Sequence, residues 1–102
     1  MLLRNTDILD FLTQHKNELR RYNIKRIGLF GSYAHNNASE NSDIDFLVEY
    51  QHGKKSLTNF LELIDFLEQS FHKDVELVTR ESVSKYIFPY IEKEIQYVQI
   101  ID

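Results

Sequence analysis

The sequence contains no cysteine, which removes several classes of functional site at once. Without thiols there is no disulfide scaffold, no cysteine-ligated metal site and no cysteine nucleophile, and the chain is compatible with a reducing compartment. The opening residues also lack a basic start followed by an apolar run, and no apolar stretch is long enough to span a bilayer. We therefore expect a cytoplasmic protein with no membrane partner.

A surplus of basic residues is absent as well. The chain has 12 Lys and Arg residues against 16 Asp and Glu residues, which gives a formal net charge of -4 at pH 7. Proteins that hold nucleic acid by neutralising its phosphates need excess positive charge. We expect no direct binding to nucleic acid, whereas a single nucleotide can still be bound through metal ions.

The size of the chain favours one domain. A length of 102 residues suits a single compact core, because two domains of half that size would each bury too little apolar surface. Seven Phe and six Tyr supply large apolar area in a chain that is 42% hydrophobic, so disorder is not expected. The interpretation is one domain over residues 1–102.

The spacing of apolar residues predicts alternating helices and strands. Helical spacing marks the first twenty residues and the stretch 57–71, whereas residues 43–50 alternate between apolar and mostly acidic side chains. The predicted elements are a helix capped by Asn5 or Thr6 and ending near Tyr22, strands over 24–30, 43–50 and 74–79, a helix over 56–72, a short helix capped by Ser82 or Ser84 and broken by Pro89, and a last strand or tail over 97–101. This pattern favours an α/β (α+β) fold in which helices pack on a small mixed β-sheet.

Two acids on the second predicted strand form a candidate metal site. Asp43 and Asp45 are two residues apart, so on a strand both point to the same face. Carboxylate oxygens are the ligands that Mg²⁺ prefers. An Asp-x-Asp pair also arises readily as two solvated acids, and the residues after it lack the glycine and further oxygen ligands of an EF-hand loop. The pair alone is therefore weak support for a metal site.

Gly31-Ser32, at the end of the first predicted strand, is a candidate phosphate site. A glycine lets a phosphate approach the backbone, and a following turn aims free amides at it, with the Ser32 hydroxyl as a further donor. The segment is not a Walker loop, because no Gly-Lys-Ser/Thr follows a glycine-rich run. Taken alone, Gly-Ser after a strand is more often an ordinary turn.

The two features together are more specific than either alone. The first segment is Gly-Leu-Phe-Gly-Ser-Tyr-Ala, which includes Gly31-Ser32, and ten residues, 33–42, separate Ser32 from Asp43, where the run Asp-Ile-Asp-Phe-Leu-Val begins. This arrangement resembles the signature of the DNA polymerase β nucleotidyltransferase superfamily. The likeness is greatest to the minimal nucleotidyltransferase (MNT) antitoxins that are partners of HEPN toxins, and it covers nearly the whole chain.

The resemblance implies a role for each matching residue. Asp43 and Asp45 would bind two Mg²⁺ ions, and Gly31 and Ser32 would hold the outer phosphates of ATP. Glu76, in Val-Glu-Leu-Val, would be the third catalytic and metal-binding carboxylate. Two cations can stabilise both the attacking and the leaving oxygen of a transferring phosphoryl group. The implied activity is transfer of AMP from ATP to a hydroxyl acceptor, a tyrosine of a cognate HEPN toxin.

Two departures from the family pattern leave alternatives open. Glu76 replaces the usual Asp, so Asp74 is an alternative for the third acid. The non-functional interpretation of Glu76 is an exposed acid on a strand. Many relatives carry Arg where this chain has His35. These departures motivate a second hypothesis, in which the fold neutralises its partner by binding alone, without turnover.

The acceptor and the remaining residues are less well defined. Small-molecule transferases generally carry an added substrate domain, for which 102 residues leave no room, so we expect a partner or a second copy to supply the acceptor site. His35, Lys54 and Lys55 are interpreted as solvated loop residues rather than nucleotide contacts. Tyr86, Phe88 and Tyr90 are interpreted as core or half-buried residues rather than a partner surface.

Overall fold

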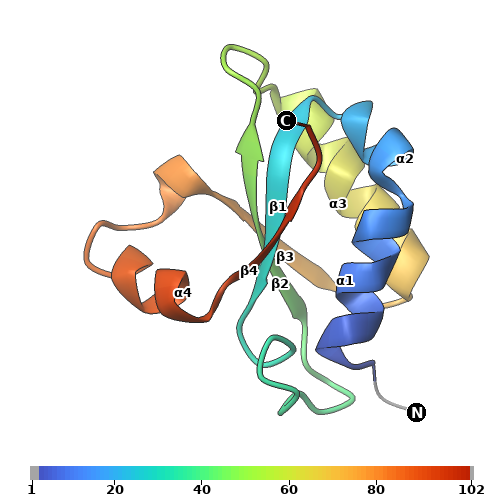
Figure 1. Cartoon of the computed structure of the whole chain (residues 1–102), viewed down its shortest axis with the longest axis vertical. Helices are drawn as coiled ribbons and strands as arrows, with labels where there is room; N and C mark the ends of the chain where they lie inside the picture. The colour runs from blue at the N-terminus through green and yellow to red at the C-terminus, as the bar shows by residue number, and fades with distance from the viewer. Residues whose placement is uncertain (1–2, 102) are drawn as a thin grey trace.

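A computed structural model describes residues 3–101. The elements are α1 (Asn5–Gln14), α2 (Lys16–Arg20), β1 (Ile24–Phe30), β2 (Ile44–Tyr50), α3 (Leu57–Phe71), β3 (Val75–Thr79), the 3-10 helix η1 (Arg80–Ser82), α4 (Phe88–Glu94) and β4 (Gln96–Gln99). The strands form one sheet in the order β3-β2-β1-β4, in which β1 is antiparallel to β2 and β4, and β2 is parallel to β3. Helices α1, α2 and α3 lie on one side of the sheet and α4 on the other (Figure 1). The predicted mixed sheet with packed helices is confirmed.

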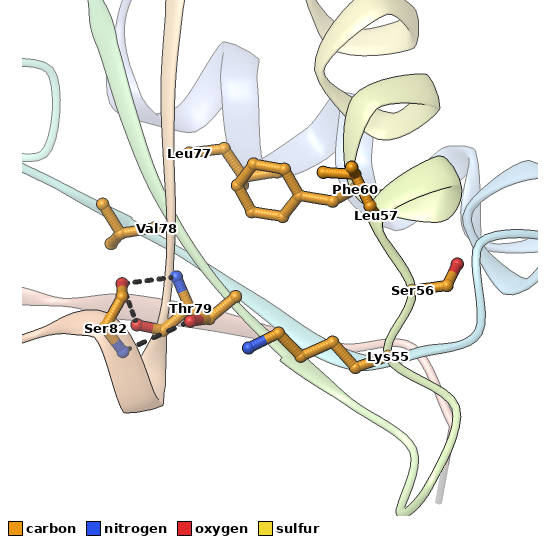
Figure 2. Close-up of a pocket in the computed structure, with 8 residues that line it drawn as sticks. All are labelled: Lys55, Ser56, Leu57, Phe60, Leu77, Val78, Thr79 and Ser82. Atoms are coloured by element: carbon orange, nitrogen blue, oxygen red, sulfur yellow. Dashed lines mark hydrogen bonds between the residues drawn. The ribbon is translucent and has the colours of Figure 1, made fainter.

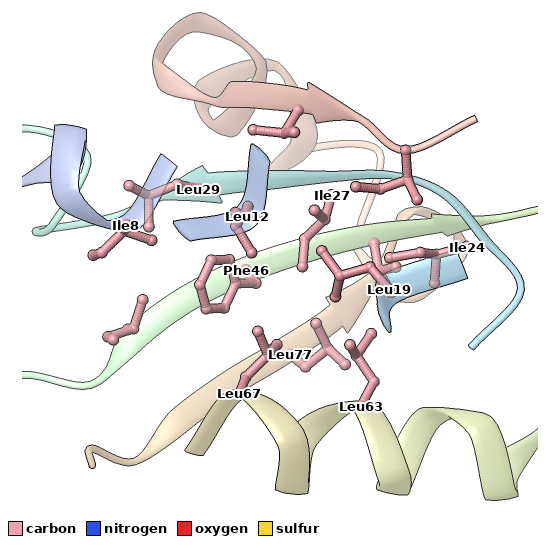
Figure 3. Close-up of a cluster of buried hydrophobic side chains, with 14 of the residues drawn as sticks. Ile8, Leu12, Leu19, Ile24, Ile27, Leu29, Phe46, Leu63, Leu67 and Leu77 are labelled. Atoms are coloured by element: carbon pink, nitrogen blue, oxygen red, sulfur yellow. The ribbon is translucent and has the colours of Figure 1, made fainter. Parts of the chain in front are cut away.

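The main core lies between the sheet and the first three helices. Ile44, Phe46 and Val48 alternate along β2 and are fully buried, as the period-two pattern predicted. They belong to one cluster with Leu63 and Leu67 of α3, and Figure 3 shows Phe46, Leu63 and Leu67 packed with residues from α1 and β1. This packing leaves the odd-numbered residues of β2, among them Asp45, on the opposite face of the sheet.

The first helix differs from the prediction at its start and in its length. Its N-cap is Arg4, not Asn5 or Thr6, because the Asn5 side chain donates to the Ala34 carbonyl instead. A single helix to Tyr22 was also wrong, since the chain leaves helical geometry at His15 and resumes in α2. The His15 ring stacks on Phe11 with centroids 3.9 Å apart and its Nδ1 lies 2.8 Å from the Phe11 carbonyl, which stabilises the break.

Pro89 begins the last helix rather than breaking it. It lies in the first turn of α4, where a missing N–H costs no hydrogen bond. In this register Phe88 and Ile91 face the sheet and pack on Leu47, which forms a second, smaller core. Tyr90 therefore points to solvent and is 71% exposed.

The expectation of half-buried aromatics is accordingly wrong for two of the three residues. Tyr86 is 74% exposed, in the turn before α4, and Tyr90 is exposed on α4 itself, whereas Phe88 is buried as expected. The Arg80 guanidinium lies 3.4 Å from the centre of the Phe88 ring and covers it. Contrary to the prediction, neither Ser82 nor Ser84 caps the last helix, because the N-cap of α4 is Ile87. Ser82 instead lies in η1, where its amide donates to the Thr79 side chain.

Gly28 makes room for the C-terminal segment on the face that carries α4. A Cβ at Gly28 would lie 2.5 Å from Ile95 Cδ1 and 2.9 Å from Tyr97 Cδ1, so any larger residue there would force these side chains to shift. The close approach brings the end of α4 beside the end of β1. None of the helices between residues 3 and 101 combines the length and apolar character needed to cross a membrane.

Candidate active site

Gly31 and Asp45 meet where β1 ends and β2 begins. Phe30 pairs with Asp45 in the antiparallel register, and Gly31 follows with a φ of 76°, in the left-handed region that favours glycine. A Cβ at Gly31 would collide with Asp45 Oδ2 and lie 3.1 Å from Asp45 Cγ. The predicted phosphate site and the predicted metal site are thus in direct contact.

Asp45 also faces Glu76 across the parallel pair of strands. The two residues are direct partners in the register of β2 and β3. Burial of Asp45, the charge of Glu76, a hydrogen bond with Glu76, and the charges of Asp43 and Glu94 raise the pKa of Asp45 from 3.8 to about 6. The charges of three other carboxylates therefore act on Asp45, an arrangement that a cation would stabilise.

The other predicted acids lie at the edges of this point. Asp43 is exposed and immediately precedes β2, close enough for its charge to act on Asp45. Asp74 is exposed just before β3, and its carbonyl accepts from the Ile44 amide. Because Asp45 pairs with Glu76, the geometry favours Glu76 over Asp74 as the third acid.

The segment from Gly31 to Asn37 forms a compact loop after β1. The Ser32 carbonyl accepts from the amides of His35 and Asn37, at 3.3 and 3.1 Å. Within residues 3–101, neither the Ser32 amide nor the Tyr33 amide has a hydrogen-bond partner in the protein. These free donors follow directly on the residue that touches Asp45, so they suit the phosphates of a nucleotide whose metal ions are bound by the acids.

Glu94, the last residue of α4, is a member of the site that the sequence did not indicate. Its Oε1 accepts from the Gly31 amide at 3.2 Å, and its Oε2 lies 2.5 Å from His35 Nε2. His35 is half-exposed, as expected of a loop residue, but it has this partner. No local motif marks Glu94, because its position depends on how α4 docks on the sheet.

The donor chemistry of the site fits Mg²⁺. Mg²⁺ is usually bound by one or two carboxylates, with water and substrate phosphates completing its shell. Across residues 3–101, no three or more His, Asp or Glu side chains form a ready-made metal cage. Asp43 and Asp45 beside the free amides after Gly31 match a site that the nucleotide completes.

A separate groove lies on the α3 side of the sheet. It has a volume of about 440 Å³ and an apolar lining that includes Leu57, Phe60 and Leu77, with Lys55 at its rim (Figure 2). Lys55 Nζ lies 3.9 Å from a Glu81 oxygen, and Lys54 is exposed. This groove is formed by the C-terminal end of β3, whereas Glu76 is near the N-terminal end, so the two lysines are remote from the acids.

Known proteins are similar to this chain over most of its length. A family model described as nucleotidyltransferase domain matches residues 12–98. The protein adenylyltransferase MntA of Thermococcus cleftensis is 39% identical over 98 residues, which cover 95% of this chain and 98% of that protein. A protein of Methanocaldococcus jannaschii that is provisionally named a protein adenylyltransferase is 39% identical over 93 residues, covering 89% and 90% of the two chains.

Two solved structures are also similar to this chain. A crystal structure of a toxin-antitoxin with AMP-PNP contains a chain that is 26% identical with a TM-score of 0.66, over 96% of this chain and 73% of that one. A provisionally named minimal nucleotidyltransferase is 25% identical with a TM-score of 0.71, over 86% and 93%. This chain therefore belongs to the nucleotidyltransferase domain family and is an enzyme of the minimal nucleotidyltransferase type.

Proposed function

We propose that this chain transfers AMP from ATP to a hydroxyl group of a partner protein, a tyrosine of a cognate HEPN toxin, and thereby acts as an antitoxin. The observation that carries the proposal is the contact between Gly31 and the Asp45 carboxylate, which joins a loop with free amides to an acidic site. Two relatives support the choice of reaction: MntA is named a protein adenylyltransferase, and the neighbour with AMP-PNP is a toxin-antitoxin.

The proposed reaction forms one bond and breaks one. The acceptor oxygen attacks the α-phosphorus of ATP, the bond from that phosphorus to the bridging oxygen breaks, and pyrophosphate leaves. The acceptor proton passes to a carboxylate or to water. Two Mg²⁺ ions, when bound, supply positive charge to the attacking and leaving oxygens. This reaction needs positioning and charge neutralisation more than covalent chemistry from the protein.

Each residue of the site has a proposed role in this scheme. The Ser32 hydroxyl and the free Ser32 and Tyr33 amides donate to the outer phosphates. Asp43 and Asp45 would hold Mg²⁺, and Glu76, which faces Asp45 across the strand pair, would be the third carboxylate of that site. Asp45 has a pKa of about 6 and is therefore mostly ionised at neutral pH, ready to act as a ligand.

Mass spectrometry of the partner tests this proposal. The chain, ATP and Mg²⁺ are mixed with the product of the adjacent gene as the candidate partner, and the intact mass of that partner is measured over time. We expect stepwise gain of AMP, mapped to tyrosine by peptide fragmentation. Asp43→Asn should abolish the gain, while Asp10→Asn, at an exposed acid of α1, should not. An unmodified partner with the wild-type chain, or equal modification with Asp43→Asn, would refute the proposal.

A second candidate function is neutralisation by binding alone. It is favoured by exposed side chains at α4: Tyr86, Ile87 and Tyr90 are 74%, 53% and 71% exposed. Large exposed apolar side chains gathered in one short segment, from the turn before α4 into its first turn, suit a protein contact. This candidate predicts a complex that forms equally without ATP and protects cells after alanine replaces both Asp43 and Asp45. Loss of protection by that double variant, with the complex intact, would exclude it.

A further inference from the structure

Glu94 links two parts of the chain that are far apart in sequence. It belongs to α4, and its two carboxylate oxygens contact Gly31 and His35, 63 and 59 residues earlier. Its side chain is 26% exposed, so the contacts are partly shielded from water. The contact with the His35 ring nitrogen is short, whereas the 3.2 Å bond from the Gly31 amide lies at the long end of the range for an N–H···O hydrogen bond.

The loop from Gly31 to Asn37 is also held at its middle and far end. The Ala34 carbonyl accepts from Asn5 Nδ2 at 3.1 Å and from Gln96 Nε2 at 3.2 Å. Asn36 Oδ1 accepts from the Asn5 amide at 2.7 Å. These contacts hold the loop between α1 and the start of β4. Glu94 adds a contact at the Gly31 end of the loop, where the loop meets Asp45.

The position of Glu94 costs electrostatic energy. Its charge is one of those that raise the pKa of Asp45, so it adds a further acid to a site already rich in carboxylates. Glu94 takes only the Gly31 amide and leaves the Ser32 and Tyr33 amides free. If Glu94 occupied the place of a phosphate, it would also accept from the Ser32 and Tyr33 amides. Its contacts therefore orient the loop without filling it.

We propose that Glu94 is a positioning residue, which sets Gly31-Ser32 for the phosphates of the nucleotide by holding the Gly31 amide and the His35 ring. This inference rests on the proposed nucleotide site. Removing the carboxylate should weaken ATP binding more than it slows the chemical step. A hydrogen bond to a charged group is worth about one order of magnitude or more in affinity, so we expect Glu94→Ala to raise the KM for ATP about tenfold and to leave kcat nearly unchanged.

Three variants test the role kinetically. Glu94→Gln keeps an acceptor for the Gly31 amide, so it should restore most of the KM that Glu94→Ala loses. Glu92→Ala, at an exposed acid of the same helix, is the matched control and should behave as wild type. If Glu94→Gln instead loses as much as Glu94→Ala and needs more Mg²⁺ for half-maximal rate, Glu94 is a metal ligand and the inference is wrong.

A spectroscopic measurement separates this inference from the proposed function. The chain has only three glycines, so protein labelled with ¹⁵N-glycine gives three amide signals. Without any nucleotide, the Gly31 signal should shift in Glu94→Ala, while Gly53, which has no atom within 4 Å of a Cβ position, should not. An unshifted Gly31 signal, or an unchanged KM in an active Glu94→Ala enzyme, overturns this inference alone. A wild-type chain that transfers no AMP overturns the proposed function, and this inference with it.

Discussion

Gly31→Ala tests the contact on which the site depends. Gly31 has a φ of 76°, and a methyl group there would enter the Asp45 carboxylate. The left-handed backbone costs a non-glycine residue about 1–2 kcal/mol, and forcing an extra group into packed surroundings costs roughly 1–3 kcal/mol more. Asp45 must also move, and a shift of about 1 Å at a reacting centre can cost about 100-fold in rate.

Gly53→Ala is a matched control within the same chain. Gly53 has a φ of 75°, almost that of Gly31, but a Cβ there meets nothing within 4 Å. It therefore carries the backbone strain without the contact. In a domain of this size each 1 kcal/mol lowers Tm by about 4–8 °C. We expect Gly53→Ala to lower Tm by the strain alone and to keep full activity.

The two variants are compared by thermal unfolding, by ATP binding and by AMP transfer. Gly31→Ala should unfold at a lower temperature than Gly53→Ala and should lose about 100-fold in transfer rate. If the two variants lose stability equally and both retain AMP transfer, the Gly31–Asp45 contact has no consequence for the site, and the expectation is refuted.

The remaining predictions concern the charge of the site, a helix cap and the core. Asp45→Asn should raise Tm at about pH 7.5, because burial and the charge of Glu76 disfavour the ionised form of Asp45 in the folded state. The gain in Tm should fade as pH falls from about 6 to 3.8, below which Asp45 is neutral in both the folded and the unfolded state. A gain in Tm that is independent of pH in thermal scans would contradict this assignment. Ser56→Ala should cost about 1 kcal/mol in urea unfolding, since the Ser56 hydroxyl accepts from the Asn59 amide at 3.0 Å, and Ser56→Asp should recover it. Leu67→Ala, at a fully buried residue of α3, should cost about 2–5 kcal/mol, whereas Leu61→Ala, at a residue 55% exposed, should be nearly neutral; equal losses would show that α3 packs differently.

The strands and the acid pair could be predicted from the sequence because the signals are local. The alternation in residues 44–50 reflects the face of β2 that packs on the first three helices, and it is sufficient to predict that Asp45 lies on the other face. The first strand is found over Ile24–Phe30 as predicted, with Gly31 next to it. Ser56 and the 57–71 apolar pattern likewise predicted α3, which ends at Phe71 with His72 as its C-cap.

Features that depend on packing between distant segments could not be predicted in this way. Glu94 reaches the loop only because Phe88 and Ile91 seat α4 on Leu47. The break at His15 depends on ring stacking with Phe11, which the apolar pattern of the first helix does not indicate.

The effect of Pro89 also depends on context that the sequence pattern leaves open. A proline either ends a helix or begins one, and the choice here sets which face of α4 is buried. Because Pro89 begins α4, Tyr90 is turned to solvent, and Tyr86 remains outside the helix and exposed.

Transfer of isotope from ATP is the most direct test of the central claim, that the loop at Gly31 and the acids at Asp43 and Asp45 carry nucleotidyl transfer. The chain, Mg²⁺ and the partner protein are incubated in parallel with ATP labelled at the α-phosphate and with ATP labelled at the γ-phosphate. We expect label on the partner from the α position alone, with pyrophosphate released in equal amount, and no label with Asp45→Asn. Label from the γ position, or α-label that persists in Asp45→Asn, would contradict it.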